Sequence, residues 1–277
     1  MTTDNLDALV KQLAGAKKYR AIGISEDTVR DILITELERQ PNEKAAIQSA
    51  KRKLHEVMAL YLGDPDYERA VHELEAAFAT DKATAGETNA VKATCAQLMA
   101  IHDSTRERLP LLDTFYAQIF AVTGTPETVL DIACALNPLA IPWMGLPENA
   151  QFYAYDIHQQ RVDFLNAYFT LQGIGGGAFN RDILVQYPVE SGDVAFLLKE
   201  IHRMEKRRKG IVLPLLDALE VRWIVLSSPT KSRTGRRTMK DTYQQQVQGL
   251  LADRDWSITE IEFENELIYC VDKNAHE

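Results

Sequence analysis

The fold of this chain of 277 residues is decided by the stretch Val129-Leu130-Asp131-Ile132-Ala133-Cys134-Ala135-Leu136-Asn137-Pro138. An apolar run passes directly into small residues, which predicts a buried strand followed by a tight loop. Open α/β sheets bind ligands at the carboxyl ends of their strands, where small residues let the backbone approach closely. The loop lacks the GxGxxG pattern of dinucleotide-binding folds and the GxxxxGK[ST] pattern of P-loops. For this stretch alone, a strand-to-helix turn without a ligand remains the alternative.

Two aspartates further along favour a ligand at this edge. Asp156 ends the second expected strand, and Asp182 follows a short run at 178–181 that can be the third strand. A carboxylate at the first position can accept both hydroxyls of a ribose, and one at the second can accept the exocyclic amine of an adenine. A nucleoside without phosphates fits this pattern, and S-adenosyl-L-methionine is the commonest such cofactor. Taken singly, each aspartate is more typical of a helix cap or a solvated turn.

The strand pattern continues to the carboxyl end. Short β-rich runs, separated by segments long enough for crossover helices, lie at 128–134, 151–157, 193–199 and 223–227. Two alternating runs at 257–263 and 266–272 have only Glu264 and Asn265 between them, which predicts an antiparallel hairpin. We therefore expect an α/β fold with a Rossmann-like, mostly parallel seven-stranded sheet and a terminal antiparallel hairpin. This is the arrangement of class I S-adenosylmethionine-dependent methyltransferases.

The amino-terminal part has a different period. From Asp4 to about His102, apolar residues recur at three- and four-residue steps, which predicts helices and no strand. Ser25, followed by acidic residues, is expected to cap one of these helices. We expect an all-helical domain over residues 1–105 and a methyltransferase domain over residues 106–277.

Composition excludes several classes of protein. The chain has no secretory signal pattern and no apolar run of about 18 residues, so we expect a cytoplasmic protein without a membrane span. Its three cysteines lack CxxC spacing and its six histidines lack HExxH spacing, so no metal site is expected. The net charge of -9, taken for the whole chain, argues against a simple basic nucleic-acid binder.

Four longer motifs are more specific than the general pattern. They are His102-Asp-Ser-Thr-Arg-Glu-Arg-Leu-Pro110, Asp131-Ile-Ala-Cys-Ala-Leu-Asn-Pro-Leu-Ala140, Ser228-Pro-Thr-Lys-Ser232 and Asn265-Glu-Leu-Ile-Tyr269. Together they closely resemble the aminoglycoside-resistance 16S rRNA methyltransferases, in particular the sisomicin-gentamicin-resistance methylases. The likeness spans essentially the whole chain.

This resemblance implies that a monomer transfers methyl from S-adenosylmethionine to N7 of guanine 1405 in 16S rRNA. The helical domain would then dock on the assembled 30S ribosomal subunit. The resemblance implies that Arg108 holds the methionine carboxylate and that Lys199 lies near the cofactor, and it agrees with the ribose and adenine roles of Asp156 and Asp182. Further cofactor contacts are expected from Ala133, Ala135, Ile157, Ile183 and Leu198. Two residues depart from the family pattern: Ala135 replaces the usual Gly, and Ser228 replaces the usual Phe before Pro-Thr.

Methylation of guanine N7 needs few protein groups. The N7 lone pair attacks without first losing a proton, so no general base is expected, and catalysis depends on proximity and alignment. The base lies in an RNA helix and must be unstacked into a pocket. We expect this pocket to be framed by Asn137, Pro138, Ser228, Pro229 and Lys199. Turn chemistry without a ligand is the alternative for both loops.

Positive charge is concentrated in one segment. Residues 199–240 hold 12 basic and 4 acidic side chains, a net charge of +8, whereas the remainder carries -17. Phosphate contacts are expected from this segment and from two smaller basic clusters in the helical half, although solvated helix faces are the alternative. The predicted RNA-binding residues are Lys17, Lys18, Arg20, Lys51, Arg52, Lys53, Lys231, Arg233, Arg236, Arg237 and Lys240. A second basic cluster lies at 203–209.

Other functions remain open at this stage. A class I methyltransferase could act on another rRNA site, on a small molecule or on a protein. A non-catalytic RNA-binding module could retain the same fold.

Overall fold

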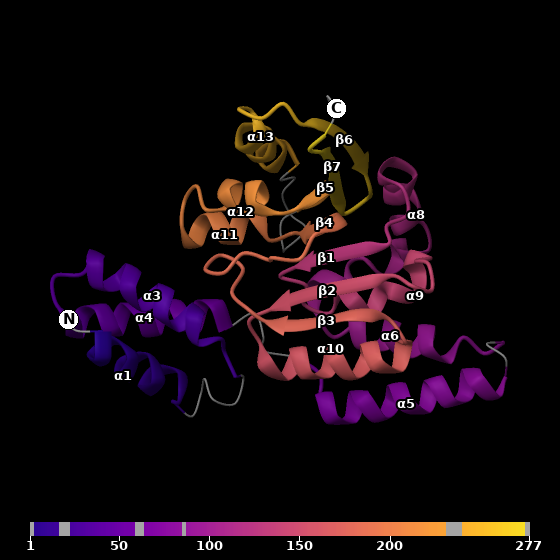
Figure 1. The fold of residues 1–277 in the computed structure, drawn as a ribbon, viewed down its shortest axis with the longest axis horizontal. Coiled ribbons are helices and arrows are strands. Elements are labelled where there is room, and N and C mark those ends of the chain that lie inside the picture. Colours follow the sequence, from indigo (N-terminus) through magenta and orange to yellow (C-terminus); the bar gives the residue numbers. More distant parts are fainter. Residues whose placement is uncertain (1–2, 17–22, 59–63, 85–86, 231–239, 275–277) are drawn as a thin grey trace.

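The computed structural model describes residues 3–16, 23–58, 64–84, 87–230 and 240–274. A seven-stranded sheet lies at its centre, with the strand order β3-β2-β1-β4-β5-β7-β6 (Figure 1). The strands are β1 (Thr128–Ile132), β2 (Gln151–Asp156), β3 (Gly175–Asn180), β4 (Gly192–Leu198), β5 (Val221–Pro229), β6 (Ser257–Glu262) and β7 (Glu266–Asp272). The first five are parallel, and β7 runs antiparallel between β5 and β6. This confirms the predicted class I methyltransferase fold with its terminal hairpin.

Strand ends differ slightly from the sequence-based prediction. β1 ends at Ile132, two residues early, because Ala133 adopts a positive φ of 53° that no extended strand allows. β3 begins at Gly175, before the expected run, because three consecutive glycines pair with β2. β5 extends to Pro229, which pairs with Glu266 of the antiparallel neighbour.

Helices cover both faces of the sheet. One face is covered by α5 (Tyr67–Ala83), α6 (Ala90–Met99), α8 (Leu112–Thr123), α9 (Ile141–Met144) and α10 (Gln159–Gln172). The other face is covered by α11 (Ile201–Arg207), α12 (Val212–Ala218) and α13 (Lys240–Leu251). Short helices α7 (Asp103–Arg106), η2 (Leu109–Leu111) and η3 (Asn137–Ala140) lie in the connections.

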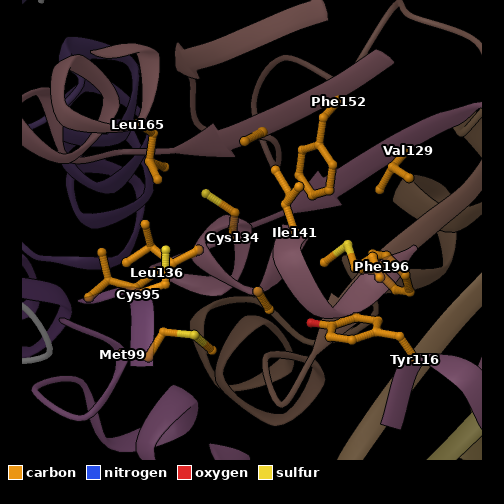
Figure 2. Close-up of a cluster of buried hydrophobic side chains, with 14 of the residues drawn as sticks. Cys95, Met99, Tyr116, Val129, Cys134, Leu136, Ile141, Phe152, Leu165 and Phe196 are labelled. Atoms are coloured by element: carbon orange, nitrogen blue, oxygen red, sulfur yellow. The ribbon is translucent and has the colours of Figure 1, made fainter. Parts of the chain in front are cut away.

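Neighbouring strand residues point into opposite cores. Val129 packs in the first core, whereas Leu130 packs in the second. Figure 2 shows the first core, in which Cys95 and Met99 of α6 lie in one cluster with strand residues such as Phe152. Apolar residues continuous on both faces explain why the β-rich runs of the sequence show little alternation.

A separate helical lobe stands beside this three-layer body (Figure 1). It contains α1 (Thr3–Ala14), α3 (Glu26–Arg39) and α4 (Glu43–Met58), which enclose their own core around Val29, Leu33 and Leu54. We call these three helices the N-terminal lobe. In contrast, α5 and α6 share the core of the sheet, so the helices expected over 1–105 divide between two cores. The domain boundary at 105/106 therefore stays a prediction.

Three absences concern only the part of the chain that the structure describes. No helix there is long and apolar enough to cross a membrane. No group of His, Cys, Asp and Glu side chains there is arranged to hold a metal ion. Cys95, Cys134 and Cys270 are buried free thiols.

Candidate active site

A cavity opens at the carboxyl ends of β1, β2 and β3, beside the N-terminal lobe. Six of the residues expected to bind cofactor line it: Ala133, Ala135, Asp156, Ile157, Asp182 and Ile183. The remaining lining residues are Val57, His102, Tyr155, Arg161, Arg181, Leu184, Glu200, Arg203, Met204 and Arg207. We call this the first cavity. The residues expected at this sheet edge therefore meet in one cavity, and their binding of cofactor stays a prediction.

The loop after β1 has an unusual backbone. Ala133 and Ala135 have φ values of 53° and 48°, in the left-handed region that glycine adopts most readily. The amide of Cys134, between them, donates to the carbonyl of Tyr155 at the end of β2 (2.9 Å). This hydrogen bond holds the loop against β2, and both alanines line the first cavity.

Asp156 has open acceptor positions that suit a ribose. Its Oδ1 accepts the amide of His158 (2.9 Å), and its Oδ2 accepts Nη1 of Arg161 (2.7 Å). A carboxylate offers about four acceptor positions. Among the described residues two are filled, so two remain for the two hydroxyls of a ribose.

Asp182 is more completely occupied. Its Oδ1 accepts the amide of Leu184 (3.1 Å), whereas its Oδ2 accepts the hydroxyl of Thr28 (2.8 Å) and pairs with Nη1 of Arg207 (2.7 Å). By the same count, one position remains on Oδ1, enough for one N–H of an adenine amine. The donor and acceptor pattern of the first cavity therefore fits the adenosine part of S-adenosylmethionine.

Arg108 lies away from the first cavity. Its guanidinium is 1 % exposed and donates to Glu266 Oε1 (2.8 Å) and to Asn137 Oδ1 (2.8 Å). Burial alone would raise the pKa of Glu266, but the charges of Arg108 and Lys199 hold it below its usual range. Arg108 therefore connects η3, through Asn137, to β7, through Glu266. Its role toward a methionine carboxylate stays a prediction.

A second cavity lies next to the first and shares Arg203 with it. Three of the residues expected to frame the target base line it: Lys199, Ser228 and Pro229. Lys199 has a φ of 62°, and its Nζ contacts Glu107 Oε2 (2.9 Å) and Glu266 Oε2 (3.2 Å). The remaining lining residues are Asp103, Ser104, Arg106, Glu107, Ile201, His202, Ser227, Tyr243, Gln246 and Val247.

Two residues expected in the base pocket lie elsewhere. Asn137 is buried, its amide donates to Asp131 Oδ2 (2.9 Å), and its Oδ1 accepts the hydroxyl of Tyr116 (2.8 Å). Pro138 is buried beside it in η3. Neither residue lines the first or second cavity, and neither does Leu198. Both polar atoms of the Asn137 side chain are therefore hydrogen-bonded to buried residues beside the loop after β1.

Four of the predicted RNA-binding residues lie in the part of the chain that the structure describes. Lys51 and Arg52 are exposed on α4, whereas Lys53 pairs with Glu36 (2.6 Å) and Lys240 pairs with Glu262 (2.6 Å). The others lie outside the described residues: Lys17, Lys18, Arg20, Lys231, Arg233, Arg236 and Arg237.

Sequence reasoning missed several residues of the first cavity. Arg161, 1 % exposed, holds Asp156 and also Asp64 Oδ1 (2.7 Å), which precedes α5. His102 lines the same wall, where desolvation and the charge of Arg161 lower its pKa to about 4. Desolvation raises the pKa of Glu200 to about 7. No local sequence pattern indicates the contact of Arg161 with Asp64, because these two residues are 97 positions apart in the chain.

Comparison with known proteins identifies the family. The model of the family described as ribosomal RNA methyltransferase (FmrO) matches residues 15–270. The chain belongs to this family. The FmrO-family protein is thus a ribosomal RNA methyltransferase, as the resemblance implied.

Relatives and solved structures cover almost the whole FmrO-family chain. A 16S rRNA (guanine(1405)-N(7))-methyltransferase of Frankia casuarinae is 35 % identical over 272 residues, covering 96 % of this chain and 93 % of that protein. One of the same name from Serratia marcescens is 34 % identical, covering 97 % and 98 %. The rRNA methylase from Escherichia coli superposes with a TM-score of 0.74 at 31 % identity, covering 98 % and 100 %. The 16S rRNA methyltransferase RmtF, solved with S-adenosyl-L-homocysteine, gives 0.75 at 26 %, covering 98 % and 99 %.

Proposed function

We propose that this protein transfers a methyl group from S-adenosylmethionine to N7 of guanine 1405 in 16S rRNA, and thereby protects the ribosome from aminoglycosides. Relatives similar over nearly their full length carry this activity in their names. The observation that carries the proposal is the pairing of the two cavities. The first has acceptor positions matched to adenosine, and the second shares Arg203 with it.

The cofactor residues of this proposal follow from the open acceptors. Asp156 accepts the two ribose hydroxyls and Asp182 accepts the adenine amine. Ile157 and Ile183, next to these aspartates, supply apolar wall, and Ala133 and Ala135 bring the backbone close. The cofactor itself supplies an activated methyl group on a positively charged sulfur.

The base is placed rather than deprotonated. Lys199, Ser228 and Pro229 line the cavity proposed to receive guanine 1405, out of its stack. The N7 lone pair forms the new N–C bond while the S–C bond breaks, so the positive charge passes from sulfur to the guanine. No proton leaves N7, and the protein contributes alignment and exclusion of water.

In this proposal the protein is a cytoplasmic monomer and binds the assembled 30S subunit. Exposed Lys51 and Arg52 of the N-terminal lobe would contact rRNA phosphates, and the basic segment around Lys240 would contact others. The helices over 1–105 serve as the docking domain and residues 106–277 as the methyltransferase domain.

The test offers labelled S-adenosylmethionine with intact 30S subunits, naked 16S rRNA and 50S subunits. We expect label in 30S, and strand cleavage at one guanine after borohydride and aniline treatment. Asp156→Ala should abolish labelling. Asp163→Ala, which removes an exposed carboxylate on α10, serves as the control and should not. Label in none of the three substrates would overturn the proposal. Label at another guanine would show that the target is not guanine 1405.

A further inference from the structure

The N-terminal lobe is attached to the sheet beside the first cavity. The amide of Ser25 donates to the carbonyl of Ile157 (3.1 Å), and the amide of Gln159 donates to the carbonyl of Gly23 (3.2 Å). Ile24 and His158 form an isolated antiparallel bridge between these bonds. Ser25 precedes α3 as predicted, but its side chain makes no capping bond. Its backbone instead joins the lobe to the residue that follows Asp156.

Thr28, in the first turn of α3, reaches the second cofactor aspartate directly. Its side chain is fully buried, and its hydroxyl donates to Oδ2 of Asp182 (2.8 Å). The two residues are 154 positions apart in the chain. A hydroxyl has one hydrogen to donate, so this bond orients the threonine side chain as well as the carboxylate.

Asp31, one turn after Thr28 on α3, completes the connection. Arg207 of α11 pairs with Asp182 Oδ2 through Nη1 (2.7 Å) and with Asp31 Oδ2 through Nη2 (2.7 Å). Arg208 pairs with Asp31 as well. The same helix of the N-terminal lobe therefore holds Asp182 twice, directly through Thr28 and indirectly through Arg207.

These contacts fill one side of the Asp182 carboxylate. Oδ2 is occupied by Thr28 and Arg207, whereas Oδ1 accepts one hydrogen bond and keeps an open acceptor position. The lobe thereby leaves Oδ1 as the oxygen available to a ligand. The amide of Ser25 also donates to the carbonyl of Ile157, the residue after Asp156. A shift of α3 would therefore move the surroundings of both aspartates.

We propose that Thr28 is a positioning residue of the cofactor site, and that cofactor occupancy and attachment of the N-terminal lobe stabilise each other through the Thr28–Asp182 bond. This inference rests on the proposed role of Asp182 in binding adenine. Linkage is reciprocal: a lobe held by rRNA binds cofactor more tightly, and a loaded site presents Lys51 and Arg52 in a fixed orientation. Each partner then strengthens the binding of the other, whichever binds first.

The first experiment measures the affinity of the full chain for S-adenosylhomocysteine by calorimetry. Thr28→Val keeps the shape of the side chain and removes the donor, and we expect its Kd to rise about tenfold, as for one hydrogen bond to a charged group. Thr28→Ser keeps the hydroxyl and should stay within about twofold of wild type. Thr35→Val, two turns along α3, is the matched control and should bind as wild type.

The second experiment measures amide hydrogen exchange of residues 23–33 with and without S-adenosylhomocysteine. We expect the ligand to slow exchange of the Ser25 amide in the wild type and in Thr28→Ser, and to leave it unchanged in Thr28→Val. A purely structural role would alter unfolding without ligand but not this ligand-dependent difference. If Thr28→Val does not fold, Asp31→Asn is measured in its place, with a smaller loss expected in the same direction.

The outcomes separate this inference from the proposed function. If Asp182→Ala, which removes the acceptor oxygens, binds S-adenosylhomocysteine like the wild type, the adenine role of Asp182 is wrong. If Asp182→Ala loses affinity but Thr28→Val and Asp31→Asn retain it, with ligand-dependent protection intact, the coupling is overturned and the cofactor site stands.

Discussion

Ala135 stores backbone strain at the cofactor edge, and replacing it with glycine should stabilise the protein. Its φ is 48°, a conformation that costs a residue with a Cβ about 1–2 kcal/mol. Glycine adopts it freely but loses about 0.5–1 kcal/mol more on folding because its unfolded chain is more flexible. The methyl group of Ala135 is partly exposed, so little packing is lost. We expect Ala135→Gly to raise the free energy of unfolding by about 0.5–1 kcal/mol.

The matched control is Ala154→Gly in β2. Ala154 is fully buried in an ordinary strand, so the same substitution loses both a buried methyl group, about 0.8 kcal/mol, and chain entropy. Urea denaturation of both variants at one pH gives the comparison, and calorimetry with S-adenosylhomocysteine checks that Ala135→Gly still binds ligand. If Ala135→Gly destabilises the protein as much as Ala154→Gly does, the strain argument is refuted.

Three further predictions concern charge. Arg161→Met removes the buried partner of Asp156 and should cost about 3–5 kcal/mol of stability in urea denaturation; a loss below about 1 kcal/mol would contradict the buried-pair argument. The pKa of His102 is lowered to about 4, so the folded protein holds fewer protons than the unfolded chain between that pH and about 6.5. The contribution of His102 to stability should therefore fall as pH drops through this window, so the free energy of unfolding should fall more steeply, or rise less, in the wild type than in His102→Gln; equal slopes against pH in urea titrations would disprove this. Lys51→Ala with Arg52→Ala should lower the slope of log affinity for 30S against log salt by about two in filter binding, and an unchanged slope would remove these residues from the interface.

The local parts of the fold follow closely from the sequence. The hairpin was expected at 257–263 and 266–272, and β6 and β7 occupy Ser257–Glu262 and Glu266–Asp272. Asp156 ends β2 as predicted, because apolar runs of strand length bounded by turn residues determine strands locally. The glycine run before Ala178 was missed as strand, since glycine has low strand propensity and β3 forms there only by pairing with β2.

The candidate site was predictable only where a residue ends a strand or closely follows one. Ala133, Asp156 and Asp182 lie at the expected edge for that reason. Asn137 follows β1 too, yet its amide is taken up by Asp131 and Tyr116, which no spacing in the sequence indicates. Packing decided whether a side chain near the edge faces the cavity or the core.

The sequence by itself determined the class I sheet, its order of loop and acidic residues, and the family, because hydrophobic period and motif spacing are properties of neighbouring residues. Only the tertiary structure decided how the N-terminal lobe is attached and which groups hold the cofactor aspartates. Arg161, which holds Asp156, also reaches Asp64 across 97 positions, and Thr28 reaches Asp182 across 154. Contacts over such separations exist only after distant segments have packed together, because a hydrogen bond requires atoms within about 3 Å and chain spacing alone does not supply that proximity.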